Sequence, residues 1–131
     1  MLSGHKLIVL VCDNGGFAVI NRLQVNQGGA SYNNLIADTN HANLVYVDFA
    51  AHARAMGCVA ETVTSIGELE EAFERARAAD RTSVIAMNVS AYEWTEGGNF
   101  WEVGVPEVSN RDAVLAAHDS LIQGKQGQRL V

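Results

Sequence analysis

The sequence predicts an α/β domain in which a parallel sheet is flanked by helices, giving three layers. Three observations lead to this prediction: short apolar runs that fit strands, helical periodicities between those runs, and short links from strand to helix to strand. Consecutive units of this kind form parallel sheets through right-handed crossovers. With 131 residues and 48% hydrophobic residues, the chain is large enough for one domain with a real core.

The first strand is expected over Lys6–Cys12, because Leu7–Cys12 is an unbroken apolar run of the kind that is buried on both faces of a sheet. The glycine-containing turn Asp13–Gly16 closes it. Ligands of open α/β sheets bind beyond the carboxyl ends of the strands. An Asn side-chain oxygen and glycine carbonyls are hard, neutral donors that Mg²⁺ or Ca²⁺ accepts, so this turn is the first candidate site.

Two structures compete for the residues after the turn. Asn14-Gly15 is typical of a type I′ hairpin, with Phe17–Ile20 as the returning strand. The spacing of Phe17, Ile20 and Leu23 instead favours a short helix over Phe17–Gln24. The segment Val25–Asn43 has no clean period, and both a functional loop and a solvated surface loop remain open.

The next helix is expected over Phe49–Met56, with Asp48 as its N-cap and Gly57 as its stop. Its apolar stripe is Phe49, Ala50, Ala53 and Met56. A second strand follows over Val59–Val63. Ser65 and Glu68 then form a capping box for a helix that runs to Ala79 and buries Leu69, Ala72, Phe73 and Ala76.

A third strand is expected over Thr82–Val89. The irregular segment Tyr92–Ser109 contains Trp94 and Trp101, which need a surface to pack against, in the core or in a partner. The capping signature at Ser109–Asp112 predicts a last helix over Asn110–Gln123, stopped by Gly124, with its apolar face on Val114, Leu115, Leu121 and Ile122.

Composition excludes some classes of function. A net charge of −6 and a pI near 5.0 argue against a nucleic-acid surface. Cys12 and Cys58 are expected to be free thiols in a reducing cytoplasm, and no leader or membrane-spanning pattern is seen. No residue is assigned a catalytic role, because no nucleophile stands beside a positioned base.

The segment Cys12–Gln24 resembles the thiamine-diphosphate-dependent enzymes, in the half of the cofactor motif that contains an Asn. The resemblance implies that Mg²⁺ is held by the Asn14 side chain and the Gly16 carbonyl. It further implies that Gly15, Gly16 and Phe17 meet the diphosphate, and that Ile20, Asn21 and Gln24 face the cofactor or substrate.

A wider resemblance is to the trihydroxycyclohexanedione hydrolases, ring-opening enzymes of inositol breakdown. It is carried by Ile20–Gln24, Gly28-Gly29, Asn33–Leu35, Val47–Gly57 and Trp101–Ser109. It implies hydrolysis of a carbon–carbon bond in a cyclic dione, with thiamine diphosphate and Mg²⁺ as cofactors. A homo-oligomer, dimeric or tetrameric, is expected as well, because exposed apolar parts of such a chain favour self-association. A related decarboxylase or acetolactate-synthase-like enzyme and a non-catalytic binding module remain alternatives.

The family pattern also contains Gly-Asp-Gly about two dozen residues before the Asn, and this chain has none. The chain is therefore expected to be a carboxy-terminal piece of a thiamine-diphosphate-binding fold that lacks its first strand–helix unit. That would leave the Leu7–Cys12 strand with an uncovered edge that invites pairing with another chain. Alone, the chain is expected to bind the cofactor weakly and to turn nothing over.

Overall fold

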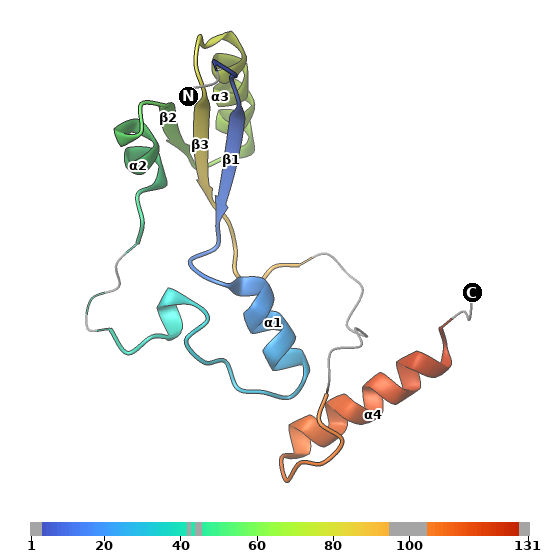
Figure 1. The fold of residues 1–131 in the computed structure, drawn as a ribbon. Helices are drawn as coiled ribbons and strands as arrows, with labels where there is room; N and C mark the ends of the chain where they lie inside the picture. Colours follow the sequence, from blue (N-terminus) through green and yellow to red (C-terminus); the bar gives the residue numbers. More distant parts are fainter. Residues whose placement is uncertain (1–3, 42, 44–45, 95–104, 129–131) are drawn as a thin grey trace. The chain divides into compact units, whose positions relative to one another are not determined.

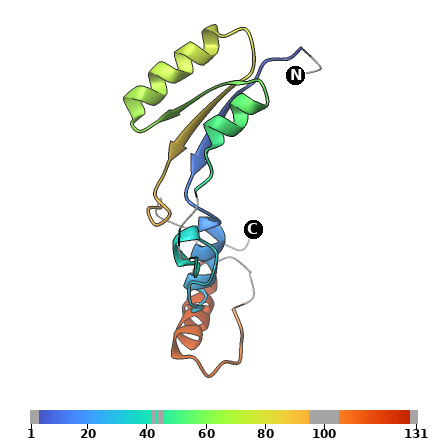
Figure 2. The same cartoon turned by 90° about the vertical axis from the view of Figure 1, so that its left-hand side faces the viewer.

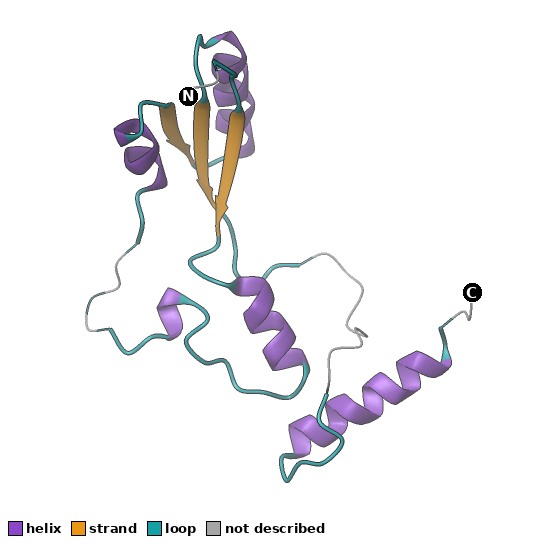
Figure 3. Cartoon of the chain, in the orientation of Figure 1, coloured by secondary structure: helices purple, strands orange, loops and turns teal. Residues whose placement is uncertain are grey.

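The structure is a computed structural model that describes residues 4–41, 43, 46–94 and 105–128 (Figure 1). Trp101 and its neighbours, for which packing was predicted, lie outside these residues. The chain forms two compact units, residues 1–15 with 43–91 and residues 16–42 with 92–131. Figure 3 shows that strands occur in the first unit and that helices occur in both. No helix in the described ranges has the length and apolar character needed to cross a membrane.

The first unit contains a parallel three-stranded sheet in the order β1-β3-β2. The strands are β1 (Ile8–Asp13), β2 (Val59–Val63) and β3 (Ser83–Asn88), all close to their predicted positions. Because β1 pairs in parallel with β3 and Phe17–Ile20 leads into a helix, the hairpin alternative is wrong.

Helices α2 (Phe49–Ala55) and α3 (Ile66–Ala78) lie on opposite faces of this sheet, which gives the predicted three layers (Figure 2). The topology explains the arrangement. The crossover from β1 to β2 runs across the sheet in one direction, and the crossover from β2 back to β3 runs in the opposite direction. Because both crossovers are expected to be right-handed, their helices lie on opposite faces of the sheet.

The core beneath α3 consists of Val63, Ala72, Ala76 and Ile85, with Ile8, Leu69 and Met87 packed around it. On the other helix Ala50 and Ala53 are the buried residues. Both helices thus face the sheet mainly through alanines, which have no bulk to hold a helix away. The predicted burial of Phe73 and Met56 is wrong, because both side chains are largely exposed.

The prediction that the first strand is buried on both faces is also wrong. Leu10 is 46% exposed and Val9 is exposed to a similar degree. The reason is position: β1 is an edge strand, so it has β3 on one side, and the two helices pack mainly on β2 and β3. The apolar side chains of β1 are therefore only partly covered by the other elements of this unit.

The second unit contains α1 (Ala18–Asn26), the short 3₁₀ helix η1 (Ile36–Asp38) and α4 (Asp112–Gln126). Helix α4 begins two residues later than predicted, because the Ser109 hydroxyl accepts the N–H of Arg111 in a local turn and does not cap the helix. It also continues past Gly124 and is capped at Gly127. Val114 is buried, whereas Leu115 and Ile122, which were predicted on its apolar face, are exposed.

Candidate functional site

The turn after β1 is ordered by Asp13, the last residue of the strand. Its backbone carbonyl accepts the N–H of Val89, at 2.9 Å, and its carboxylate Oδ1 accepts the N–H of Gly15, also at 2.9 Å. A short polar side chain that bonds to the backbone two residues later forms an Asx turn. Gly15 has a φ of +72°, in the left-handed region that glycine adopts without strain. The first of the two segments that make up the first unit therefore ends in a turn that Asp13 and Gly15 define.

Gly16 opens the second unit with a close backbone contact. It forms an isolated antiparallel bridge with Leu35, and the adjacent Phe17 N–H donates to the Asn34 carbonyl at 2.7 Å. A Cβ added at Gly16 would lie 2.4 Å from that same carbonyl oxygen, and its φ is +154°. Glycine is required at this position by sterics and by conformation, and the contact ties the start of α1 to the loop that follows it.

The N-terminus of α1 lacks a side-chain cap. Phe17 is its N-cap residue, no side chain accepts a hydrogen bond there, and the first turn contains no acidic residue. In α2 and α3, by contrast, Asp48 and Ser65 accept the N–H groups of Ala51 and Glu68. The free N–H groups of a helix start favour an anion. The sequence after the turn therefore offers the type of helix end to which phosphates bind.

The predicted site residues on α1 differ in their surroundings. Phe17 is 71% exposed and Ile20 is 51% exposed, whereas Asn21 is only 7% exposed. The Asn21 side chain lies 2.7 Å from the Ser31 hydroxyl, which in turn bonds to the Asp38 carboxylate. A hydroxyl has one hydrogen to donate, and the carboxylate accepts only. The Ser31 hydroxyl therefore has two acceptors within reach, Asn21 Oδ1 and the Asp38 carboxylate, and donates its hydrogen to one of them at a time.

Gln24 takes part in a second set of bonds between α1 and the loop. Its Oε1 accepts from the Asn34 side chain at 3.0 Å, and its Nε2 donates to the Ala30 carbonyl. Gly28 and Gly29 lie against the backbone of the same unit: a Cβ added at Gly28 would meet Ala113, and one added at Gly29 would meet Gln24. Residues 28–38 are therefore bound closely to the helices of the second unit.

The sequence reasoning missed one contact of this unit. The Arg22 guanidinium lies 4.9 Å from the centre of the Trp94 ring, a cation–π distance. No spacing rule links these two residues, because they are far apart in the chain.

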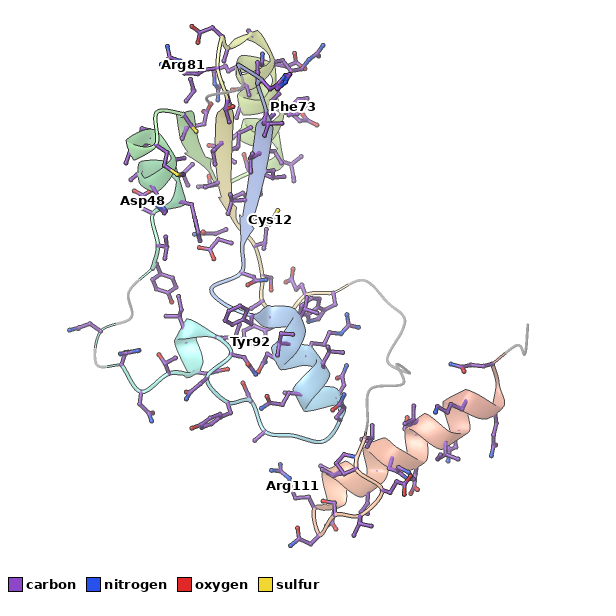
Figure 4. The ribbon with its side chains drawn as sticks, in the orientation of Figure 1. Cys12, Asp48, Phe73, Arg81, Tyr92 and Arg111 are labelled. Atoms are coloured by element: carbon purple, nitrogen blue, oxygen red, sulfur yellow. The ribbon has the colours of Figure 1, made fainter. Side chains whose placement is uncertain are left out.

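The two cysteines are free thiols, as predicted. Figure 4 labels Cys12, which is exposed near the end of β1.

The described residues contain no group of three His, Cys, Asp or Glu side chains that could hold a metal ion. The resolved pKa shifts occur on the surface of the first unit. Hydrogen bonds from Thr64 lower the pKa of Glu68, and a hydrogen bond from Arg81 lowers that of Asp80. The hydrogen bonds that cause these shifts lie at the start of α3 and at the turn after it, away from the turn that follows β1.

A parallel α/β sheet whose first strand ends in a glycine turn and an uncapped helix is the form of a phosphate- or diphosphate-binding domain. The family described as "Thiamine pyrophosphate enzyme, C-terminal TPP binding domain" matches residues 2–87 of the 131. This is more than half of the chain, and the chain belongs to that family. The resemblance found in the sequence is thereby confirmed.

Curated relatives narrow the comparison. The chain is 35% identical to 3D-(3,5/4)-trihydroxycyclohexane-1,2-dione hydrolase 2 of Bacillus cereus, over 97% of this chain and 21% of the relative. It is also 35% identical to the 3D-(3,5/4)-trihydroxycyclohexane-1,2-dione hydrolase of Halalkalibacterium halodurans, over 88% of this chain and 18% of the relative. The Bacillus subtilis hydrolase is 34% identical over the same shares. The chain therefore spans about a fifth of the length of these relatives. No solved structure gives a significant match.

Proposed function

We propose that residues Asn14–Phe17 and the start of α1 are this chain's contribution to a thiamine-diphosphate site. The observation that carries the proposal is the Asp13–Phe17 turn, which lies inside the part of the chain that matches the family. In this proposal the N–H groups of the first turn of α1 receive the diphosphate, because that helix start lacks a side-chain cap. Gly15 and Gly16 allow the backbone to turn from strand to helix without a Cβ in the way.

The donor atoms fit a divalent cation in part. Asn14 supplies an amide oxygen and Gly16 a backbone carbonyl, both hard and neutral ligands that suit Mg²⁺. Asp13 contributes negative charge nearby, although one of its oxygens already accepts the Gly15 N–H. Since Mg²⁺ demands near-octahedral oxygen coordination, the remaining ligands would be diphosphate oxygens and water. Cation and diphosphate are therefore expected to bind together.

We infer further that the enzyme to which this domain belongs cleaves a carbon–carbon bond of a cyclic 1,2-dione by hydrolysis, with a homo-oligomeric assembly in the cytoplasm. The names of the curated relatives support the reaction, and the assembly and the compartment are inferred from the sequence alone. When bound, thiamine diphosphate supplies the nucleophilic carbon that attacks a carbonyl. The role of this chain is to hold and orient the cofactor, and Phe17 and Ile20, at the start of α1, are exposed and thus available to contact it.

Calorimetric titration of thiamine diphosphate into the chain tests the binding proposal. We expect heat of binding only with Mg²⁺, and affinity at least about tenfold weaker in Asn14→Ala, the usual effect of losing a ligand to a charged group. Asn110→Ala, an exposed Asn before α4, is the matched control and should bind like the unchanged chain. Equal binding by both variants would exclude Asn14 as a ligand.

Complementation tests the reaction. The chain is co-expressed with the part of the Bacillus subtilis relative that precedes the matching segment. Opening of a cyclic dione is then followed alongside decarboxylation of a 2-oxo acid. We expect dione hydrolysis only when both parts are present. Decarboxylation instead would favour the alternative of a related decarboxylase or acetolactate-synthase-like enzyme. Cofactor binding without either reaction would favour a binding module.

A further inference from the structure

One face of α1 carries polar residues that bind a loop of the same unit. Phe17, the N-cap residue, precedes Asn21 by four positions and Gln24 by seven, a spacing that places the three on one face of a helix. Each of them makes a hydrogen bond to the segment of residues 30–38, here called the 30–38 loop. This face of α1 is therefore occupied by the protein's own loop.

Two side chains of α1 hold the 30–38 loop. The Oδ1 of Asn21 lies 2.7 Å from the Ser31 hydroxyl, which also reaches the Asp38 carboxylate near the other end of the loop. The Oε1 of Gln24 accepts the side-chain amide of Asn34, in the middle of the loop, at 3.0 Å. The amide oxygens of both α1 residues thus already have a partner inside the second unit.

The middle of the loop reaches the start of α1. Asn33 has a φ of +52°, in the left-handed region that Asn enters more readily than other residues with a side chain. The next two residues contact the helix start: the Asn34 carbonyl accepts the Phe17 N–H at 2.7 Å, and the buried Leu35 forms a bridge with Gly16. Asn34 is therefore bound to α1 twice, by its backbone carbonyl and through its side chain to Gln24.

These contacts determine which N–H groups of the helix start remain for an anion. The first bond within α1 runs from the Asn21 N–H to the Phe17 carbonyl, at 2.9 Å, so the N–H groups of residues 18–20 have no acceptor inside the helix. The Phe17 N–H already donates to the loop. Ala18 is buried, whereas Val19 and Ile20 are about half exposed. The N–H groups of Val19 and Ile20 are thus the ones that a diphosphate can reach.

We propose that Asn21 and Gln24 are positioning residues of the diphosphate site and make no contact with the cofactor themselves. They hold the 30–38 loop, whose Asn34 carbonyl fixes the Phe17 N–H, and in this way they set the direction of the Val19 and Ile20 N–H groups. The proposal rests on the proposed function. It gives both residues a role different from the one that the resemblance implies, in which their side chains face the cofactor or substrate.

The physical basis is preorganisation. A loop that is ordered before the ligand arrives does not have to be ordered during binding, so the affinity is higher. One hydrogen bond between neutral groups contributes an amount that corresponds to about three- to tenfold in a binding constant. Loss of either side-chain link from α1 to the loop should therefore weaken cofactor binding by about three- to tenfold.

A matched pair of variants at Ser31 tests the first link. Ser31→Thr keeps the hydroxyl, and Ser31→Val has the shape of threonine without it; Ser31 is exposed, so either side chain has room. Calorimetric titration of thiamine diphosphate with Mg²⁺ into the full chain should show binding about three- to tenfold weaker for Ser31→Val. Ser31→Thr should bind like the unchanged chain. Equal affinity in Ser31→Val and Ser31→Thr would overturn the role of this link.

Double variants distinguish positioning from direct contact. If Asn21 acts through Ser31, the variant that combines Asn21→Ala with Ser31→Val should bind no more weakly than Asn21→Ala alone. Gln24→Met and Asn34→Ala form the second pair, and their effects should likewise fail to add. Losses that add fully in either pair would mean that the α1 residue contacts the cofactor directly, and would overturn the proposal.

Hydrogen exchange without cofactor tests the link independently of binding. The Phe17 amide should exchange faster in Ser31→Val and in Gln24→Met than in the unchanged chain and in Ser31→Thr. Unchanged exchange in both variants would overturn the proposal. Absence of cofactor binding by the unchanged chain would overturn the proposed function and this inference with it. Binding by the unchanged chain that Ser31→Val and Gln24→Met leave equally tight would overturn the positioning role alone.

Discussion

Replacing Gly16 with Ala tests the contact that joins the start of α1 to its following loop. The added Cβ would lie 2.4 Å from the Asn34 carbonyl oxygen and 2.9 Å from the Leu35 Cα. Both neighbours are backbone atoms, so neither can rotate away as a flexible side chain would. The Gly16 φ of +154° is also rare for a residue with a side chain.

The cost follows from these two effects. Overpacking costs about 1–3 kcal/mol, and an unfavourable backbone conformation costs about 1–3 kcal/mol. We therefore expect Gly16→Ala to destabilise the second unit by about 2–6 kcal/mol. The backbone hydrogen bond from Phe17 to Asn34 is expected to break in the process, because the chain must move apart at this point.

Urea unfolding and amide hydrogen exchange measure this effect. Exchange of the Phe17 amide, which donates to Asn34, should become much faster in Gly16→Ala. Gly67→Ala is the control: its Cβ meets nothing within 4 Å inside α3, so the change should stabilise the chain by up to about 1 kcal/mol. A Gly16→Ala variant with unchanged unfolding and unchanged Phe17 exchange would refute the close contact.

Three further predictions concern the first unit. Asp48→Ala removes the cap that accepts the Ala51 N–H and should cost about 1 kcal/mol in urea unfolding; no change would exclude the cap. Ala72→Leu, at a position with no exposed surface, should cost about 1–3 kcal/mol by overpacking, and a neutral result would mean that the core has room. Hydrogen bonds from Thr64 lower the folded pKa of Glu68, so its stabilising contribution is present above the ordinary value of 4.5 and is lost as the pH falls through the lower folded pKa. Glu68→Gln should flatten this part of the acid dependence of the urea midpoint, and an unchanged profile would contradict it.

The elements with local signals were predictable from the sequence. Ser65 and Glu68 defined the start of α3, Asp48 and Gly57 bounded α2, and the alternation of strand and helix predicted a parallel sheet. In each case residues a few positions apart determine the structure. The family resemblance was predictable for the same reason, because it depends on a contiguous segment.

The elements that failed depend on what lies beside them in space. The apolar run of β1 is typical of a buried strand, but the sequence of the strand does not show which strands and helices cover it, and Leu10 is 46% exposed. Phe73 is close in helical position to Ala72 and Ala76, yet it is 46% exposed and lies outside the core cluster beneath α3. Ser109 has the composition of a cap but uses its hydroxyl in a turn at Arg111. The link from Asn21 through Ser31 to Asp38 likewise requires the fold of the loop.

The location of cofactor binding is the most direct test of the central claim. Backbone amide NMR shifts are followed while thiamine diphosphate and Mg²⁺ are added to the isotope-labelled chain. The account predicts saturable shifts centred on Asn14–Ile20, which disappear when Mg²⁺ is withheld and are much reduced in Asn14→Ala. Saturable shifts that centre elsewhere, or no shifts at millimolar cofactor (roughly the weakest binding that such an experiment resolves), would contradict the assignment of this turn as the diphosphate site.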